Sequence, residues 1–181
     1  LAPAPPAAKP GEPAPPPHPQ EARVAKLRER AIDRLDQVAH DQSAPLSVDD
    51  RSDALMYLRE ALASVGRKDE ARRTAEEQRA LLDEAAAKAP NPTAASPSPW
   101  PRAAVYVFLE KPLELAPSLE ANAKALPNDY DPPARLGWIL MKGGKLAEAA
   151  AWTEKSIALA YGPRKVRVLN QRADIANKLG E

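Results

Sequence analysis

Apolar side chains recur at spacings of three and four along most of the chain after residue 20, which is the period of an amphipathic helix. Between residues 21 and 41 the apolar stripe consists of Val24, Leu27, Ala31, Ile32, Leu35 and Val38. A break follows, in which Asp49 or Asp50 is suited to cap the next helix. The pattern therefore predicts a first helix over 21–41 and a second that begins near residue 51.

The next two predicted helices form a hairpin over residues 51–89. Leu55, Leu58 and Leu62 share one face of the first, and Gly66 is expected to end that helix in the left-handed conformation. A second amphipathic helix follows after a turn of a few residues. Two antiparallel helices joined by so short a turn form an αα-hairpin.

The same alternation returns in the second half of the chain. The later units are a hairpin over 101–127, a hairpin over 132–160 and a terminal helix over 164–180. The stretch 103–109 (AAVYVFL) has the composition of a strand when it is read alone. We expect a helix there because the register of the neighbouring hairpins requires one.

Proline divides the sequence into a leader, an insertion and the helical units. Nine of the 21 prolines lie within residues 1–20, and five more fall between residues 90 and 101. Proline lacks the N–H donor and disfavours helix in the residue before it, so we expect a disordered, polyproline-rich tether over 1–20. The alternative is a ligand for an SH3-like groove, although no basic residue flanks a clear PxxP core. A shorter proline-rich insertion is predicted at 90–100, and the helical domain spans 21–181.

An internal repeat links the hairpins. With a shift of 34 positions, Leu115 falls on Ala149, Leu119 on Thr153 and Ala123 on Ile157. A period of about 34 residues made of two helices is typical of one class of helical repeat. The best unit carries a spaced set of small and apolar residues, which are Leu136, Gly137, Leu140, Gly144 and Ala149.

This set resembles the tetratricopeptide repeat (TPR) family, over roughly residues 52–181. The earliest unit matches through Leu55, Leu58, Leu62, Gly66 and Ala71. Arg59 stands in that unit where the family has a small residue, which puts its close packing in doubt but not its hairpin. The resemblance implies an all-α fold, an α–α superhelix of stacked antiparallel hairpins.

Composition excludes several classes of chemistry. The chain has 26 basic and 25 acidic residues, two histidines and no cysteine among 181 residues. The balanced charge argues against a dedicated nucleic-acid binder, and the longest apolar run is too short to span a membrane. The KGGK sequence at 142–145 lacks the spacing of a phosphate-binding loop. No serine has a plausible histidine base. We therefore expect no enzyme activity, no metal and no cofactor.

The family resemblance implies a groove lined by the first helix of each hairpin, where partner peptides dock. The residues expected on that groove are Trp100, Phe108, Trp138, Met141, Lys142, Asn170, Asp174, Asn177 and Lys178. Tryptophan is a favoured binding anchor. The alternative is that Trp100 and Trp138 only pack between neighbouring helices, as expected for Trp152. Some members grip a carboxyl terminus with paired Lys and Asn residues, of which this chain has a partial set.

These features predict a non-catalytic adaptor or scaffold with a protein or peptide partner, which could assemble a cell-envelope complex. A Pro/Ala-rich start resembles the segment after the signal peptide in many bacterial envelope proteins and lipoproteins. We therefore expect export, to the periplasm or tethered at the outer membrane through an N-terminal anchor, with the cytoplasm as the alternative. Two rivals stay open: a client-binding module of a larger enzyme, thioredoxin-like or other, and a self-associating structural module, a homo-oligomer.

Overall fold

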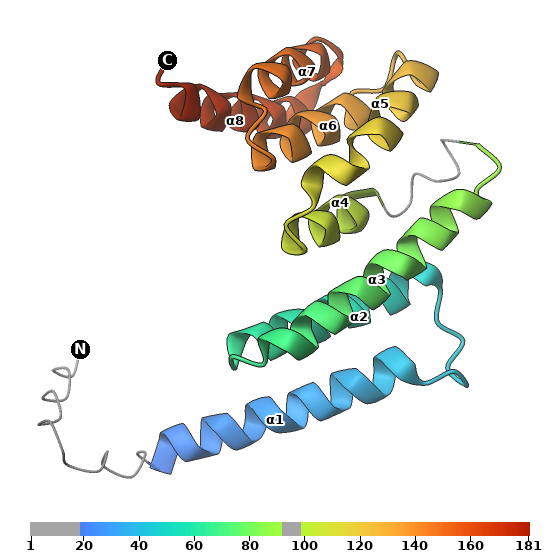
Figure 1. Ribbon diagram of the computed structural model, residues 1–181, viewed down its shortest axis with the longest axis vertical. Helices are drawn as coiled ribbons and strands as arrows, with labels where there is room; N and C mark the ends of the chain where they lie inside the picture. The colour runs from blue at the N-terminus through green and yellow to red at the C-terminus, as the bar shows by residue number, and fades with distance from the viewer. Residues whose placement is uncertain (1–18, 92–98) are drawn as a thin grey trace, which may run out of the picture.

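The computed structural model describes residues 19–91 and 99–181, and this part of the chain consists of helices and their connections, with no strand (Figure 1). The elements are α1 (Pro19–His40), α2 (Val48–Ser64), α3 (Lys68–Lys88), α4 (Pro99–Phe108), the 3-10 helix η1 (Pro112–Leu115), α5 (Ala116–Ala125), α6 (Asp131–Lys142), α7 (Leu146–Leu159) and α8 (Gly162–Leu179). Most of the expected tether and of the proline-rich insertion lies outside the described residues.

The helices stack as successive antiparallel hairpins. Two pairs are regular, α2 with α3 and α6 with α7. Between them α4 pairs with η1, and α5, which continues from η1, packs on α6; α8 is a further first helix that packs on α7. The first helices touch one another in order, α2 to α4, α4 to α6 and α6 to α8. Each second helix also packs on the first helix of the next hairpin. The chain therefore curves from α1 at one end to α8 at the other (Figure 1), and the all-α hairpin repeat is confirmed.

The second helix begins three residues earlier than predicted, because its cap differs from the expected one. Ser47, not Asp49 or Asp50, is the N-cap, and its Oγ accepts a hydrogen bond of 3.1 Å from the Asp50 N–H. Asp50 at the third helical position reaches back to the Ser47 N–H at 3.4 Å. This reciprocal capping box satisfies two N–H groups that the helix itself cannot.

The turns that end first helices share one backbone conformation. Gly66, Gly144 and Gly180 have φ angles of +82°, +78° and +77°, in the left-handed region that glycine adopts without penalty. In the second hairpin this place is taken by Glu110, with φ +61°. The sequence pattern did not reveal this turn because no glycine marks it.

The strand-like stretch in α4 is helical because its apolar residues are buried from several sides. Ala103, Val105 and Leu109 lie in the main core, which α3, α5, α6, α7 and α8 also supply. Valine has an intrinsic preference for strands, but the free energy gained by burying its side chain in this core outweighs that preference. The helix expected from the repeat register is therefore present.

The third hairpin closes around Gly137. A Cβ atom at this position would lie 2.4 Å from Thr153 Oγ1 and 3.2 Å from the Ala149 carbonyl oxygen. Only a residue without a side chain lets α6 and α7 approach this closely. This packing, with the repeated left-handed turns, makes the architecture a tetratricopeptide-like helical repeat.

Helix α1 is held at its C-terminal half. Ile32 and Ala39 are buried against α2 and α3 and Leu35 is half-buried, whereas Val24 and Leu27 are exposed. The predicted stripe is thus only partly covered. Within residues 19–91 and 99–181, no helix is long and apolar enough to cross a bilayer, and no group of three or more His, Asp or Glu side chains is arranged to hold a metal ion.

Candidate functional site

Two tryptophans from consecutive first helices meet on the α4–α6 surface. The rings of Trp100 on α4 and Trp138 on α6 pack edge to face, with centroids 5.7 Å apart and planes at 63°. Both side chains are half-buried, and Trp138 also packs against the main core. Trp100 Nε1 donates a hydrogen bond of 3.2 Å to Asp131 at the start of α6. The pair is therefore fixed in orientation and still offers ring surface to solvent.

A buried arginine, Arg135, packs against the Trp100 ring of this pair. Arg135 forms an ion pair with Asp131 one helical turn earlier, and its guanidinium lies 5.6 Å from the centre of the Trp100 ring. Burial lowers the pKa of Arg135 to about 10. Arg135 remains protonated at neutral pH and its charge is balanced by Asp131, so that it positions the tryptophan and is not available as a free cation.

Phe108 and Lys142 extend the aromatic surface along the same helices. Lys142 Nζ lies 5.8 Å from the centre of the Trp138 ring, and its side chain is exposed. Phe108 is 36% exposed, and the Arg59 guanidinium lies 4.8 Å from its ring centre. We call the set Phe108, Trp100, Trp138 and Lys142 the aromatic row. The sequence prediction named all four; α6 and the start of α4 bring Trp100, Trp138 and Lys142 into contact, whereas Phe108 lies at the other end of α4, against Arg59.

Arg59 fills the place where a small residue was expected. It is only 4% exposed, and its Nη1 donates a hydrogen bond of 2.9 Å to Gln78 Oε1 on α3. Gln78 Nε2 in turn donates to the Ser52 carbonyl oxygen at 3.0 Å. Burial lowers the pKa of Arg59, and its Nε has no hydrogen-bond partner in the described part of the chain. The first hairpin is therefore held by a buried polar chain in addition to the close packing of α2 on α3.

The other predicted groove residues do not join the aromatic row. Met141 is 7% exposed and lies in the core, so its side chain is not available to a partner. The α8 residues are exposed and form a separate polar surface, consisting of Asn170, Asp174, Asn177 and Lys178. Trp152 on α7 is half-buried against the core, with Lys155 Nζ 3.9 Å from its ring centre.

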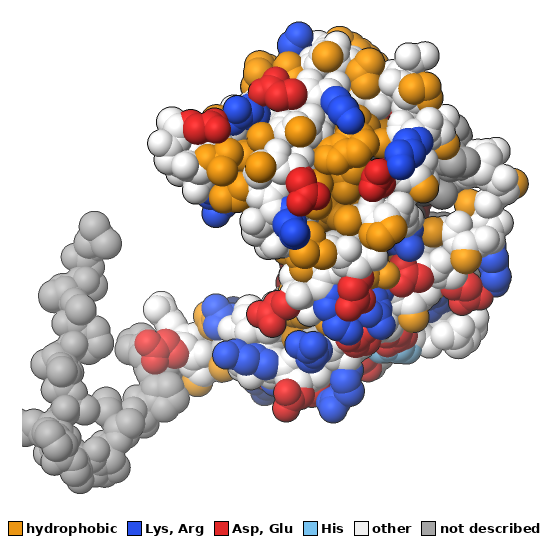
Figure 2. Space-filling model, turned by 45° about the horizontal axis from the view of Figure 1, so that its top comes forward, with side chains coloured by type: hydrophobic (Ala, Val, Ile, Leu, Met, Phe, Trp, Pro, Cys, Tyr) orange, Lys and Arg blue, Asp and Glu red, His pale blue; other side chains and the backbone are white. Residues whose placement is uncertain are grey.

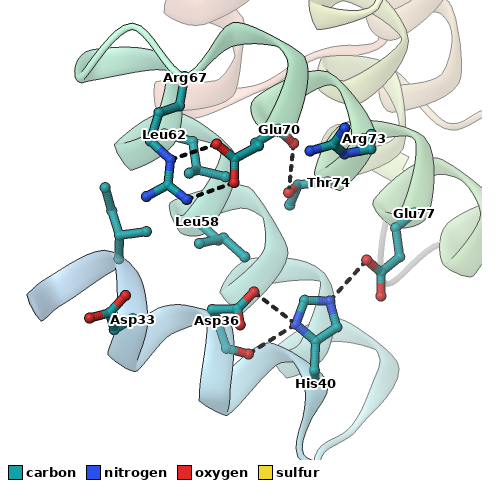
Figure 3. A pocket seen from close by; sticks show the side chains of 11 residues that line it. Asp33, Asp36, His40, Leu58, Leu62, Arg67, Glu70, Arg73, Thr74 and Glu77 are labelled. Carbon is teal, nitrogen blue, oxygen red and sulfur yellow. Dashed lines mark hydrogen bonds and ion pairs between the residues drawn. The ribbon is translucent and has the colours of Figure 1, made fainter. Parts of the chain in front are cut away.

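A hollow of about 320 Å³ lies between α1 and the first hairpin (Figure 3). His40 Nε2 lies 3.0 Å from Glu77 Oε2 on α3, and Nδ1 lies 3.2 Å from Asp36 Oδ1. The hydrogen bond to Glu77 raises the pKa of His40 above 6.5. Sequence reasoning missed this cluster, because His40 and Glu77 are far apart in the chain and meet only through the docking of α1.

Charge and apolar surface are unevenly distributed. In Figure 2 the α1–α3 part is densely covered with Lys, Arg, Asp and Glu, whereas hydrophobic side chains gather on the visible face of the α4–α8 part. Many charges of the first part are paired, for example Arg67 with Glu70 at 2.6 Å and with Glu29 at 3.2 Å. On the face shown in Figure 2 the apolar surface therefore belongs mainly to the later hairpins, although Val24, Leu27 and Tyr57 of the first part are also exposed.

Comparisons with known proteins find likeness only among solved structures. No protein-family model matches the chain, and no curated protein matches its sequence. A structure titled MamA AMB-1 is 22% identical, covers 88% of this chain and 84% of its own, and has a TM-score of 0.45. A structure titled MamA MSR-1 is 24% identical, covers 88% of this chain and 82% of its own, with a TM-score of 0.46. The fold assignment rests on this chain's own helices.

Proposed function

We propose that this protein is a non-catalytic adaptor that binds a peptide segment of a partner protein along the aromatic row. The observation that carries the proposal is the Trp100–Trp138 pair, fixed edge to face on two successive first helices and half-exposed. Aromatic anchors that are already ordered contribute much contact area with little loss of side-chain freedom on binding. The Asp131 hydrogen bond and the Arg135 guanidinium supply that order before any partner arrives.

The test is a selection of random peptides displayed on phage against the immobilised full chain. Selected peptides are synthesised, and their Kd is measured for the wild type, Trp138→Ala and Trp152→Ala. Trp152 is a matched control, because both tryptophans are half-buried against the core under a lysine, but Trp152 lies on a second helix. Loss of a central aromatic anchor costs about 2 kcal/mol or more, so Trp138→Ala is expected to raise Kd by about thirtyfold.

Trp152→Ala is expected to leave the peptide Kd near the wild-type value. Circular dichroism of both variants separates loss of binding from loss of folding. Peptides that bind Trp138→Ala and Trp152→Ala equally well would contradict the proposal. So would a selection that yields no peptide for the wild type.

A second candidate is self-association through the outer face of α8. Val166 and Leu169 are 57% and 47% exposed on this helix, which no later helix of the described residues covers. Stacked repeats normally cover such faces with a neighbour or a polar cap. Sedimentation velocity over a range of concentrations tests this candidate, with Leu169→Glu as the variant expected to remain monomeric. A wild type that stays monomeric throughout excludes it.

We also propose that the domain works outside the cytoplasm, held by its proline-rich leader. Only the composition of residues 1–20 supports this, by its likeness to the leaders of envelope proteins. Fractionation of the native cells with an antibody to this chain tests it. Recovery in the cytoplasmic fraction would exclude export, and recovery as part of a larger enzyme would favour the rival client-binding module.

A further inference from the structure

A second hollow lies where the turn after α4 meets the end of α6, next to the aromatic row. We call it the turn hollow. Its volume is about 650 Å³, and the residues that matter for its chemistry are Val107, Glu110, Pro112, Leu113, Lys142 and Gly143. That volume lies within the range of ligand sites in proteins, which is on the order of 300–1,000 Å³. Lys142 belongs both to this hollow and to the aromatic row, so that the two surfaces are continuous.

The apolar wall of the turn hollow depends on a glycine. A Cβ atom at Gly143 would lie 2.4 Å from Leu113 Cδ2, so the missing side chain lets Leu113 lie over the end of α6. Leu113 nevertheless remains 38% exposed. Val107 and Pro112 complete an apolar surface on which a further aliphatic side chain could be buried.

The charges around the hollow divide into paired and unpaired groups. Lys111 is paired with Glu76, and Glu114 with Arg79, each at 3.8 Å, so these two are directed toward α3. Within residues 19–91 and 99–181, Glu110 forms no ion pair and Lys142 forms none either. One carboxylate and one ammonium group therefore border an apolar hollow without a charged partner.

The backbone at Glu110 adds an independent observation. This residue has φ +61° at the turn position that Gly66, Gly144 and Gly180 occupy in the other units. A non-glycine residue in the left-handed region is strained, and such strain is concentrated at functional positions. The chain thus keeps a carboxylate at the rim of the hollow although glycine would suit the turn better.

We propose that the turn hollow binds an aliphatic side chain of the partner peptide, and that Glu110 pairs with a basic residue adjacent to it in that peptide. The inference rests on the proposed function, because the same peptide would continue past Lys142 onto the aromatic row. The partner is therefore a segment that combines an aliphatic and a basic residue with apolar anchors further along. The unpaired Glu110 supplies the charge complementarity, and Leu113 supplies the apolar contact.

The test uses three pools of short peptides, otherwise random, with a fixed Leu-Lys, Leu-Glu or Ser-Lys pair at the centre. Retention of each pool is measured on the immobilised full chain of the wild type, Glu110→Lys and Glu148→Lys. The wild type is expected to retain the Leu-Lys pool about tenfold better than the Leu-Glu pool, because Glu110 repels a second carboxylate. It is expected to retain the Ser-Lys pool about tenfold less well, because serine buries little apolar surface against Leu113. Glu110→Lys is expected to reverse the order of the Leu-Lys and Leu-Glu pools.

Glu148→Lys is the matched control, since Glu148 is an exposed acid on α7 that does not line the hollow. It is expected to keep the wild-type order. Misfolding of Glu110→Lys could abolish retention but could not reverse a preference, so only a reversal supports the inference. If Trp138→Ala abolishes the retention of the pools but Glu110→Lys leaves the order of the pools unchanged, the inference fails and the proposed function stands. If the wild type retains no pool, both fail.

Discussion

Arg59 and Gln78 join the two helices of the first hairpin by a hydrogen bond of 2.9 Å between side chains that are both buried. A buried guanidinium that loses its acceptor retains its charge and the cost of its desolvation. We therefore expect Gln78→Leu to lower the free energy of unfolding by about 2–3 kcal/mol. Urea denaturation followed by circular dichroism measures this.

The double variant Arg59→Met/Gln78→Leu is expected to recover most of the loss, because it replaces the polar pair with apolar groups of similar size. Gln171→Leu is the control. Gln171 Nε2 donates to the Ala134 carbonyl oxygen at 2.9 Å and to Thr153 Oγ1 at 3.0 Å, both neutral acceptors. Its loss should be smaller than that of Gln78→Leu. A double variant less stable than Gln78→Leu alone would show that the charge is not the source of the effect.

The role of Arg59 shows where sequence reasoning stops. Leu58 and Leu62 could be placed on a buried face from their spacing alone, because helical period is a local property. The repeat motif put the close packing of the first hairpin in doubt because Arg59 stands where a small residue was expected, yet α2 and α3 pack closely. It could not show that Gln78 and Phe108 would accommodate an arginine there, since these residues lie on other helices and approach only after folding.

Gly137 is the position at which the third hairpin has no room for a side chain. A Cβ atom would lie 2.4 Å from Thr153 Oγ1 and 2.9 Å from Gln171 Nε2. Glycine to alanine within a helix normally stabilises by about 1 kcal/mol, but overpacking costs about 1–3 kcal/mol. Because the clash involves several elements, we expect Gly137→Ala to be destabilising by about 1–2 kcal/mol net.

Thermal and urea unfolding of Gly137→Ala measure this effect, and Thr153→Ala on the same background is expected to restore part of the loss. The rescue is expected to be partial, because Thr153→Ala removes the nearest clashing atom together with the γ-methyl group and the acceptor of one Gln171 hydrogen bond. An increase in stability for Gly137→Ala would mean that α6 and α7 separate without cost. In contrast to Arg59, this requirement for glycine could be predicted from the spacing of Leu136, Gly137 and Ala149.

At Glu110, in contrast to Gly137, replacement by glycine is expected to stabilise the fold. Its φ of +61° is unfavourable for a residue with a Cβ atom, by about 1–2 kcal/mol. Glu110→Gly is therefore expected to raise the free energy of unfolding by about 1 kcal/mol. Gly144→Ala, at the equivalent turn with φ +78° and open space around the position, should lower it by a similar amount. Urea denaturation of both variants beside the wild type tests whether the free energy of unfolding rises for Glu110→Gly and falls for Gly144→Ala.

If Glu110→Gly is not stabilising, the carboxylate contributes to folding and not to binding, which would contradict its role at the turn hollow.

The strain at this residue could not be predicted from the sequence, because a turn without glycine gives no local signal. The aromatic row differs in this respect: the repeat register placed Phe108, Trp100 and Trp138 on first helices, and the approach of the two tryptophans follows from the stacking of α4 on α6.

The contacts of His40 predict that the docking of α1 depends on pH. Its pKa is raised above the usual 6.5, chiefly by the hydrogen bond to Glu77, and Asp36 faces it from the preceding turn of α1. A folded-state pKa above the unfolded value means that folding favours the protonated form. The contribution is therefore fully present below pH 6.5 and is lost as the pH rises through the folded-state pKa. Since the ring is 41% exposed, solvent screening keeps the effect modest.

We expect the wild type to lose unfolding free energy as the pH rises from 6.5 through the folded-state pKa of His40, and His40→Gln to lose less over the same interval. Glu77→Gln should behave like His40→Gln, because it removes the acceptor that favours the imidazolium. NMR titration of the His40 ring in the full chain gives the pKa directly, and it should fall toward 6.5 in Glu77→Gln. A His40 pKa at or below 6.5 in the wild type would contradict the contact with Glu77. Hydrogen exchange of the backbone amides gives a second measurement. If His40 holds α1 in place, the α1 amides should exchange faster relative to those of α3 as the pH rises and the imidazolium is lost. If His40 does not hold α1, the exchange of the α1 amides should show only the intrinsic pH dependence.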